Sequence, residues 1–212
     1  YRDDYTMFLG HNYRSGICTR CGEVDSDYQK PMVNPFNDVP EGSFYYTSVL
    51  WAVENGITSG TSRTTFSPGD SCLRAHVVTF LWRAAGSPAP KSTEHPFTDV
   101  KEGKYYYDAM LWAVENGITE GMTETTFSPN GTLTREQLAT MLWRAVNYIQ
   151  TQSGQQALTG SGSLTGYTDA GSVSSYAKEA VAALNKHGIM KGTSNTALSP
   201  KGSCTVEQSV LL

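Results

Sequence analysis

Two arginines lie at equivalent places in a repeated segment, and their position suits the binding of an anion. Arg74 and Arg135 are 61 residues apart, and each is expected in the first turn of a helix. A cation there opposes the helix dipole at a cost of about 0.3 to 1 kcal/mol. A guanidinium beside free backbone N–H groups can, however, hold a carboxylate with two parallel hydrogen bonds. The alternative is that each arginine pairs with a carboxylate of a neighbouring copy, such as Asp38 or Asp99.

Aromatic and glycine residues near the arginines could complete a sugar-binding site. Trp51 and Trp112 lie toward the end of a predicted helix in their copies, and an aromatic face can cover the apolar C–H face of a pyranose. Gly60 and Gly121 follow, where the missing side chain would let a sugar approach the backbone. Together with Arg74 and Arg135, we expect the binding site to contain Trp51, Trp112, Gly60, Gly121, Asp38 and Asp99.

A different chemistry is predicted in the first 35 residues. Cys18 and Cys21 form a Cys-x-x-Cys-Gly turn, a shape that directs two thiolates at one metal, and His11 could supply a third ligand. We predict structural zinc here. A local disulfide between the two cysteines, or two free thiols, are the alternatives.

These residues are positioned by a segment that occurs three times. The first two copies align at a constant offset of 61 residues, and the third follows at an offset of 70 and then 71. A period of this size is typical of supersecondary units that bury their apolar faces against one another. The predicted organisation is an N-terminal segment (1–35), motif 1 (36–90), motif 2 (97–147), a flexible linker (148–165) and motif 3 (166–212).

Each motif is predicted to be a helix, a long loop and a second helix. Apolar residues recur at i, i+3, i+4 and i+7 over 46–53 and 107–114, which is the spacing of one buried helical face. Gly56 and Gly117 should end these helices. The loops 58–70 and 119–131 are expected to pack through Phe66 and Phe127.

The second helices should begin with caps. Thr134 with Gln137, and Thr205 with Gln208, match the capping-box pattern, whereas motif 1 lacks it and Ser71 is the candidate cap. Two cysteines, Cys72 and Cys204, hold one equivalent position that Leu133 fills in motif 2. The leucine indicates a buried apolar position, so we predict two buried thiols rather than a disulfide.

The repeat resembles the S-layer homology domain. The resemblance rests on Phe-x-Asp-Val at the start of a motif, Trp-Ala-x-x-x-Gly-Ile-x-x-Gly, Thr-Phe-Ser-Pro in the loop, and Thr134-Arg135-Glu136-Gln137. It implies an all-α fold in which three tandem helix-loop-helix motifs form a pseudo-threefold bundle, here preceded by the small Cys-x-x-Cys knuckle. It also implies non-covalent anchoring of an exported protein to secondary cell-wall polysaccharide, commonly a pyruvylated glycan, in grooves between motifs. The implied location is extracellular, at the cell wall or surface layer.

Motif 3 departs from the other two where binding is expected. It has Val206 in place of the arginine and Ala183 in place of the tryptophan. We therefore predict at most two anion sites, centred on Arg74 and Arg135, with motif 3 chiefly completing the bundle.

Composition excludes several other functions. The 212 residues carry 16 basic and 20 acidic side chains, so a net charge of −4 speaks against nucleic acid as a partner, and no apolar run is long enough for a membrane span. Histidines fall in unrelated contexts, with no serine elbow and no phosphate loop, so we do not expect an enzyme. The competing hypothesis is a module that binds other surface proteins or copies of itself without binding glycan.

Overall fold

The computed structural model describes residues 12–26, 32–160 and 162–211. The chain divides into two units, residues 1–34 and 35–212, and each is described by itself. The first contains an antiparallel hairpin of β1 (Tyr13–Arg14) and β2 (Ile17–Cys18), in which Tyr13 is paired with Cys18. Ser15 and Gly16 both have positive φ in the two-residue turn, as a tight hairpin requires.

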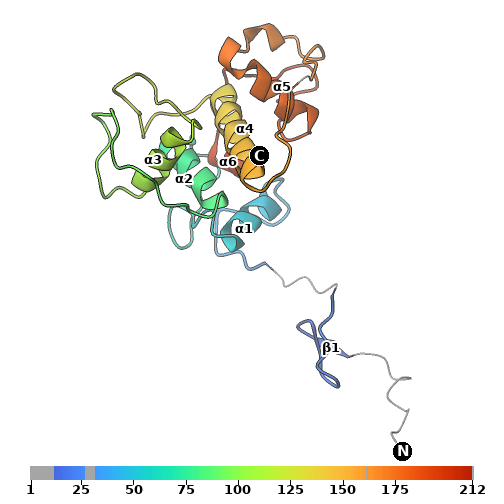
Figure 1. Cartoon of the computed structure of the whole chain (residues 1–212). Helices are drawn as coiled ribbons and strands as arrows, with labels where there is room; N and C mark the ends of the chain where they lie inside the picture. Colours follow the sequence, from blue (N-terminus) through green and yellow to red (C-terminus); the bar gives the residue numbers. More distant parts are fainter. Residues whose placement is uncertain (1–11, 27–31, 161, 212) are drawn as a thin grey trace, which may run out of the picture. The chain divides into compact units, whose positions relative to one another are not determined.

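The second unit is helical, as predicted. Its α-helices are α1 (Tyr46–Glu54), α2 (Arg74–Ala84), α3 (Tyr107–Glu115), α4 (Arg135–Gln152), α5 (Lys178–Lys186) and α6 (Val206–Leu211), with short 3₁₀ turns η2 (Ala170–Ser172) and η3 (Ser175–Ala177) before α5 (Figure 1). Gly56 and Gly117 have φ of 69° and 67° directly after α1 and α3, which confirms the predicted helix ends. Within the described residues, no helix has the length and apolarity needed to cross a membrane.

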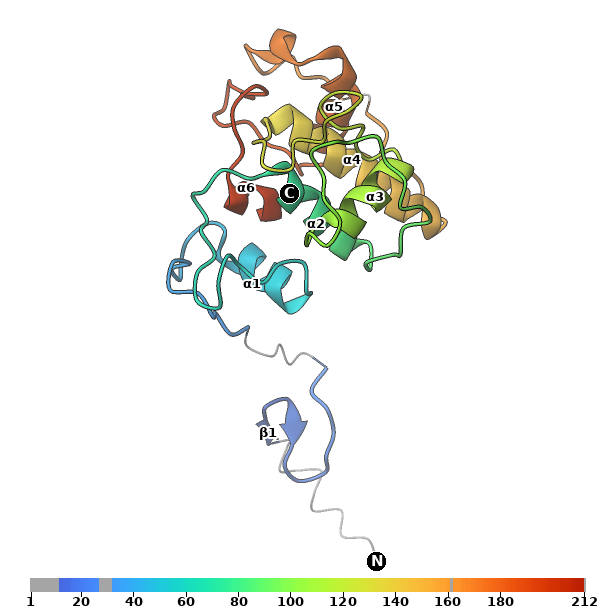
Figure 2. The same ribbon diagram turned by 90° about the vertical axis from the view of Figure 1, so that its left-hand side faces the viewer.

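The helices pack in a cyclic order that passes from one motif to the next. The second helix of each motif contacts the first helix of the following one: α2 packs on α3, α4 on α5, and α6 on α1. Two views at right angles show α2, α4 and α6 toward the middle of this unit and α1, α3 and α5 around them (Figures 1 and 2). The arrangement is the predicted pseudo-threefold bundle.

The same cycle caps the central helices. The first two backbone N–H groups of each central helix donate to carbonyls in the loop of the next motif, at 2.9 to 3.2 Å. The donor and acceptor pairs are Arg74 to Gly131, Ala75 to Pro129, Arg135 to Gly202, Glu136 to Pro200, Val206 to Asp70 and Glu207 to Pro68. These N–H groups are therefore not available to an anion, contrary to the expectation from sequence.

Side-chain caps follow the prediction only in part. Thr134 and Gln137 form the complete capping box of α4. In motif 3, Gln208 accepts from the Thr205 N–H at 3.4 Å, but the Thr205 hydroxyl is buried without a partner. The prediction that Ser71 caps α2 is wrong, because Leu73 is the N-cap and makes no side-chain bond; the loop carbonyls of motif 2 take that role.

A triangle of backbone hydrogen bonds closes around the centre of the cycle. The Cys72 N–H donates to Cys204 O (2.9 Å), Cys204 N–H to Leu133 O (3.0 Å) and Leu133 N–H to Cys72 O (3.3 Å). All three side chains are buried, and neither cysteine forms a disulfide in the structure. The prediction of two buried thiols is confirmed, and the two positions lie directly beside each other.

The long loops are fastened by one aspartate in each motif. Both carboxylate oxygens of Asp38 accept from the Phe66 and Ser67 N–H groups at 2.8 and 2.7 Å, and Asp99 and Asp169 repeat this with their own loops. The serine held in this way has positive φ in all three motifs. Phe66 and Phe127 are buried, so these loops pack through their phenylalanines as predicted.

The segment 148–165 is not the flexible linker that its composition indicated. Residues 148–152 extend α4, and Asn147 accepts from the Leu158 N–H at 2.7 Å. Trp143 Nε1–H donates to the Leu158 carbonyl at 2.7 Å, and Leu158 and Leu164 pack against the apolar cluster around α5. Gly160 lies so close to α5 that an added Cβ would overlap the Glu179 carbonyl. The segment is rich in polar residues, but Leu158, Gly160 and Leu164 pack it against the region around α5. Composition alone therefore did not reveal that this connection is ordered by packing.

Candidate functional site

Three grooves with equivalent linings surround the central helices, and each draws residues from all three motifs. Groove A is lined by Arg74, residues 118–122, residues of α4 including Gln137 and Arg144, and Tyr176. Groove B is lined by Arg135, residues 188–193, Gln208 and Phe44. Groove C is lined by Val206, residues 58–61, residues of α2 including His76 and Arg83, and Tyr105. The repeat relates the members of each set: Arg74, Arg135 and Val206 occupy one equivalent position.

Arg74 in groove A is a buried cation without a carboxylate partner. Its residue is 4% exposed, and among the described residues it forms no ion pair. One Nη–H contacts the Met122 sulfur at 2.6 Å, the guanidinium carbon lies 6.0 Å from the centre of the Phe127 ring, and Nε has no hydrogen-bond partner. Burial lowers the pKa of Arg74, although a guanidinium stays charged at neutral pH. A buried charge left without partners is costly, so groove A is suited to an anionic ligand.

Arg135 in groove B is held by backbone carbonyls. Its Nε–H donates to Leu198 O at 3.1 Å and one Nη–H to Lys191 O at 2.6 Å. These bonds fix the plane of the guanidinium and leave three of its five N–H donors for a ligand. Lys191, which is exposed, adds a second positive charge to the lining. Neither arginine pairs with Asp38 or Asp99, so the alternative expectation is wrong: both carboxylates are occupied by their own loops.

Groove C lacks the buried arginine. Its equivalent position holds Val206, which is 4% exposed, and the positive charge in the lining is Arg83, whose Nη1–H donates to Ile57 O at 3.1 Å. Burial lowers the pKa of His76, with Asp70 acting in the opposite direction, so His76 is neutral at pH 7. Groove C therefore differs in charge from grooves A and B. Its loop residues come from motif 1, and motif 3 contributes Val206.

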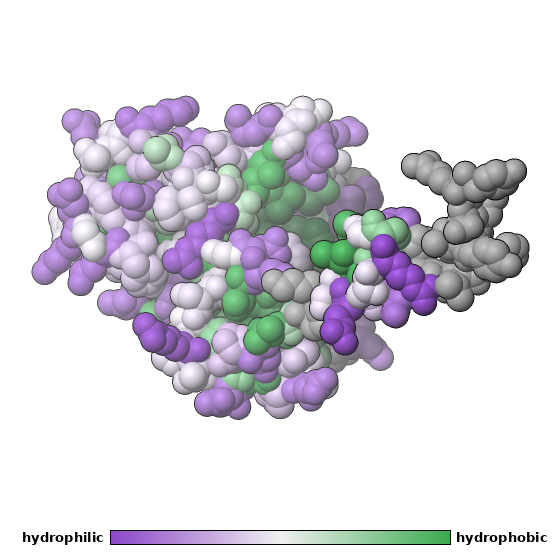
Figure 3. All heavy atoms as spheres, turned by 90° about the horizontal axis from the view of Figure 1, so that it is seen from below, coloured by the Kyte–Doolittle hydropathy of each residue, from purple (hydrophilic) through white to green (hydrophobic). Residues whose placement is uncertain are grey.

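An aromatic residue in each groove lining was missed by the sequence analysis. Phe44, Tyr105 and Tyr176 are equivalent in the repeat, are 74%, 58% and 52% exposed, and line grooves B, C and A respectively. Figure 3 shows hydrophobic areas within a mostly hydrophilic face of the molecule. The signal that could have found them is an aromatic residue, repeated in all three motifs, just before an apolar helical stripe.

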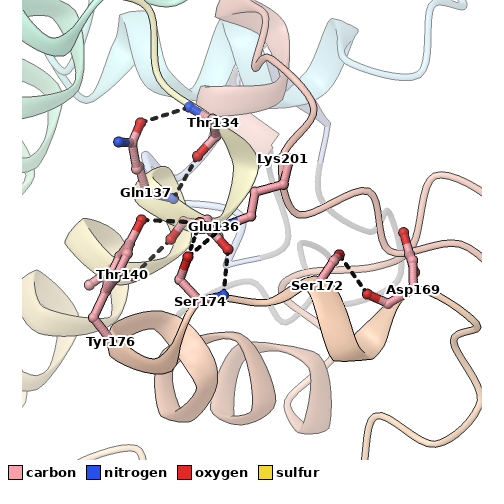
Figure 4. Close-up of polar contacts among 9 residues, drawn as sticks. All are labelled: Thr134, Glu136, Gln137, Thr140, Asp169, Ser172, Ser174, Tyr176 and Lys201. Atoms are coloured by element: carbon pink, nitrogen blue, oxygen red, sulfur yellow. Dashed lines mark hydrogen bonds and ion pairs between the residues drawn. The ribbon is translucent and has the colours of Figure 1, made fainter.

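Tyr176 is fixed at groove A by a polar network around Glu136. The Glu136 carboxylate is buried and accepts from the Ser174 N–H (3.0 Å), the Ser174 hydroxyl (2.8 Å) and the Tyr176 hydroxyl (3.2 Å), and it forms an ion pair with Lys201 (Figure 4). This network joins the start of α4 to motif 3. It orients Tyr176 beside Arg74, which comes from motif 1.

The two tryptophans of the predicted site have different surroundings. Trp112 is 0% exposed and packs edge-on against Tyr148 with ring centres 5.5 Å apart. It has no face to offer a sugar, so its assignment to the binding site is wrong. Trp51 is 54% exposed because α2 ends at Ala84, whereas α4 continues far enough to bring Tyr148 over Trp112. Trp51 lies outside the linings of grooves A, B and C.

The two glycines do line grooves, but the structure gives them a packing reason. Gly60 and Gly121 have φ of 76° and 85°, and a Cβ on either would lie within 2.6 Å of a ring carbon of Phe36 or Phe97. Each glycine therefore lets the loop close over the phenylalanine at the start of its motif. Gly60 borders groove C and Gly121 borders groove A.

Comparison with known proteins identifies the repeat. The S-layer homology domain family matches residues 35–78, 96–139 and 166–205, which together are more than half of the chain. The chain belongs to the S-layer homology domain family. It is 35% identical over 88% of its length to an endoglucanase of Bacillus sp. (strain KSM-635), 31% over 82% to a surface-layer 125 kDa protein of Lysinibacillus sphaericus, and 30% over 70% to an amylopullulanase of Thermoanaerobacterium thermosulfurigenes.

The S-layer homology motifs form a small part of these relatives. The chain spans 19%, 14% and 8% of the lengths of the three proteins, so the similarity concerns this module and not their remaining parts. Family membership and the surface-layer relative indicate association with the cell surface.

The N-terminal segment lies outside the three S-layer homology matches, which begin at residue 35. In its described part, Gly22 N–H donates to Cys18 O at 2.9 Å, and Cys18 is buried while Cys21 is exposed. The third predicted ligand, His11, lies outside the described residues. The described residues contain no group of three or more His, Cys, Asp or Glu side chains that could hold a metal, so zinc on His11, Cys18 and Cys21 stays a prediction.

Proposed function

We propose that this S-layer homology unit attaches a surface protein non-covalently to the bacterial cell wall by binding an anionic secondary polysaccharide in grooves A and B. The observation that carries the proposal is Arg74, a buried guanidinium that borders groove A and forms no ion pair with the described residues. A carboxylate on the ligand would supply the missing counter-charge and accept two parallel hydrogen bonds. A ketal-linked pyruvate is such a group.

The linings of grooves A and B suit the sugar ring of such a ligand as well as its carboxylate. Phe44 in groove B and Tyr176 in groove A present exposed aromatic surface beside an arginine, and an aromatic face can cover the apolar side of a pyranose ring. Grooves A, B and C have volumes of about 260, 550 and 400 Å³. Groove B is therefore the one best able to hold more than one sugar unit, and groove C, without a buried arginine, is assigned no anion.

Two further properties complete the proposal. The module itself is non-catalytic, and any reaction performed by the whole protein belongs to other parts of it. The competing function, protein–protein interaction or self-assembly without glycan, requires neither an unpaired buried arginine nor an equivalent aromatic residue at each groove.

The test is retention of purified protein on isolated cell walls, and on walls stripped of pyruvate by mild acid. Arg74→Ala and Arg135→Ala should each weaken binding about tenfold or more, because each removes a charge-assisted contact of about 1.5 to 3 kcal/mol. The double variant should lose retention. Stripped walls should bind the unaltered protein as weakly as intact walls bind the double variant.

Arg63→Ala is the matched control, because Arg63 is an exposed loop arginine outside all three groove linings. It changes net charge by the same amount and should leave retention unchanged. Unchanged retention of the double variant, confirmed as folded by circular dichroism, would overturn the assignment of grooves A and B.

A further inference from the structure

The two buried cysteines at the centre of the cycle lie opposite each other in a short antiparallel backbone pairing. Ser71 and Thr205 form an antiparallel bridge, so Cys72 and Cys204 are the next directly opposed pair in the same register. The Cys72 N–H donates to the Cys204 carbonyl at 2.9 Å. Directly opposed residues of an antiparallel pair have Cα atoms about 4.5 to 5.5 Å apart, which lies within the range of about 4.4 to 6.8 Å found for disulfides.

The place of this pair in the chain is also informative. Motifs 1 and 2, and motifs 2 and 3, are joined by the polypeptide, whereas motifs 3 and 1 meet only through non-covalent contacts. Each motif supplies one residue of the central triangle: Cys72 from motif 1, Leu133 from motif 2 and Cys204 from motif 3. The two cysteines therefore meet at the contact between motifs 3 and 1.

We propose that the two free thiols of the structure are the reduced form of this pair, and that on oxidation Cys72 and Cys204 form a disulfide that closes the ring of three motifs covalently between motif 1 and motif 3. Each thiol gives up one proton, and the two sulfurs together give up two electrons as the Sγ–Sγ bond forms. A low-molecular-weight disulfide or a thiol oxidoreductase is the acceptor and is reduced to two thiols. The cell surface is an environment in which disulfides form and persist.

The bond forms as the ring assembles, not after it is complete. Burial raises the pKa of Cys72 to about 11 and that of Cys204 to about 12, so the reactive thiolate is scarce once both side chains are covered. Before motif 3 docks, both thiols have ordinary reactivity, and docking brings them opposite each other. Closing the loop between residues 72 and 204 then reduces the conformational freedom of the unfolded chain.

The test is to unfold the full-length protein under reduction, refold it in a buffer of reduced and oxidised glutathione, and map peptides by mass spectrometry without reduction. Trypsin places Cys72 in peptide 64–74, Cys204 in 202–212, Cys18 in 15–20 and Cys21 in 21–63, so each pairing is distinguishable. The expected product is a cross-link of 64–74 to 202–212. The oxidised protein should unfold about 4 to 16 °C higher than the reduced protein.

Cys204→Ser and Cys72→Ala are the control variants, and both should lose the cross-link and the difference between oxidising and reducing conditions. The proposal fails if Cys72 and Cys204 remain alkylatable in denaturant after refolding, or if they pair instead with Cys18 or Cys21. It also fails if the cross-linked protein unfolds at a lower temperature than the reduced one.

Discussion

Arg74 and Arg135 occupy equivalent positions but are held in different ways, and the difference decides what each can offer a ligand. Arg135 is half-buried and already donates to two carbonyls of motif 3, so its direction is fixed before a ligand arrives. Arg74 is deeply buried, and its contacts are a sulfur and an aromatic ring, neither of which supplies a negative counter-charge. Groove A should therefore gain more from an anion, and groove B should position one more strictly.

The two equivalent tryptophans differ in burial, so replacing each by alanine should change the free energy of unfolding by different amounts. Trp112→Ala removes a fully buried ring and should lower the free energy of unfolding by about 3 to 5 kcal/mol. Trp51→Ala, at an exposed position, should cost about 0.5 kcal/mol. Urea denaturation followed by circular dichroism measures both. Similar losses in the two variants would contradict the packing described here.

Sequence patterns led to the two arginines that line grooves A and B, but not to the aromatic residues that line the grooves. Arg74 and Arg135 were found because a cation in the first turn of a helix has a cost that needs a reason. Trp112 was misassigned because its burial depends on Tyr148, which lies in a helical extension that a Gln- and Ser-rich composition concealed. Phe44, Tyr105 and Tyr176 reach grooves formed by other motifs, and no pattern within one motif reveals that.

At the scale of elements, the start of α4 is joined to motif 3 by the Glu136 network. Backbone carbonyls cap α2, α4 and α6 alike, but only α4 adds a buried carboxylate that receives bonds from Ser174, Tyr176 and Lys201. In α2 the equivalent residue is Ala75, and in α6 it is Glu207, which has one carboxylate oxygen buried without a hydrogen-bond partner. The contact between motifs 2 and 3 is therefore the one reinforced by charge.

This reinforcement should depend on pH. Burial by itself would raise the pKa of Glu136, but the bonds from Lys201 and Ser174 outweigh it and lower the pKa overall. A carboxyl whose pKa is lower in the folded state contributes its full stabilisation above its unfolded pKa of about 4.3, and loses it as pH falls through the folded value. Asp169, whose pKa is lowered by the Leu198 and Ser199 N–H groups, acts in the same direction.

Glu136→Gln should therefore lower the free energy of unfolding by about 1 to 3 kcal/mol at pH 7. The difference from the unaltered protein should shrink as the pH falls through the lowered folded-state pKa of Glu136, because the carboxyl then becomes protonated in both states of the unaltered protein. Glu207→Gln is the matched control and should cost less. Thermal unfolding between about pH 3 and pH 7 measures this, and a difference that grows on acidification would show that the carboxylate is not the stabilising group.

At the scale of the whole molecule, both the stability of the bundle and the three grooves depend on the closed cycle of motifs 1, 2 and 3. The repeat predicted three motifs and one buried face for each helix, because hydrophobic spacing is a local signal. It could not predict that each loop caps the helix of the preceding motif, or that each groove takes residues from every motif, because these relations depend on the order in which the motifs close. Motif 3, predicted chiefly to complete the bundle, supplies Tyr176 to groove A and residues 188–193 to groove B.

Removing motif 3 should therefore damage the parts that remain. A chain ending after Ser153 loses the Gly202 and Pro200 carbonyls that cap α4, the α6 face that covers α1, and two of the three hydrogen bonds of the central triangle. It should show a broad unfolding transition at least about 10 °C below that of the full chain, consistent with loss of several kcal/mol, and no retention on cell walls. A matched chain lacking residues 1–34, which form a separate unit, should unfold like the full chain. If the chain ending at Ser153 instead unfolds cooperatively at the original temperature, the motifs are independent and the closed cycle is not what stabilises them.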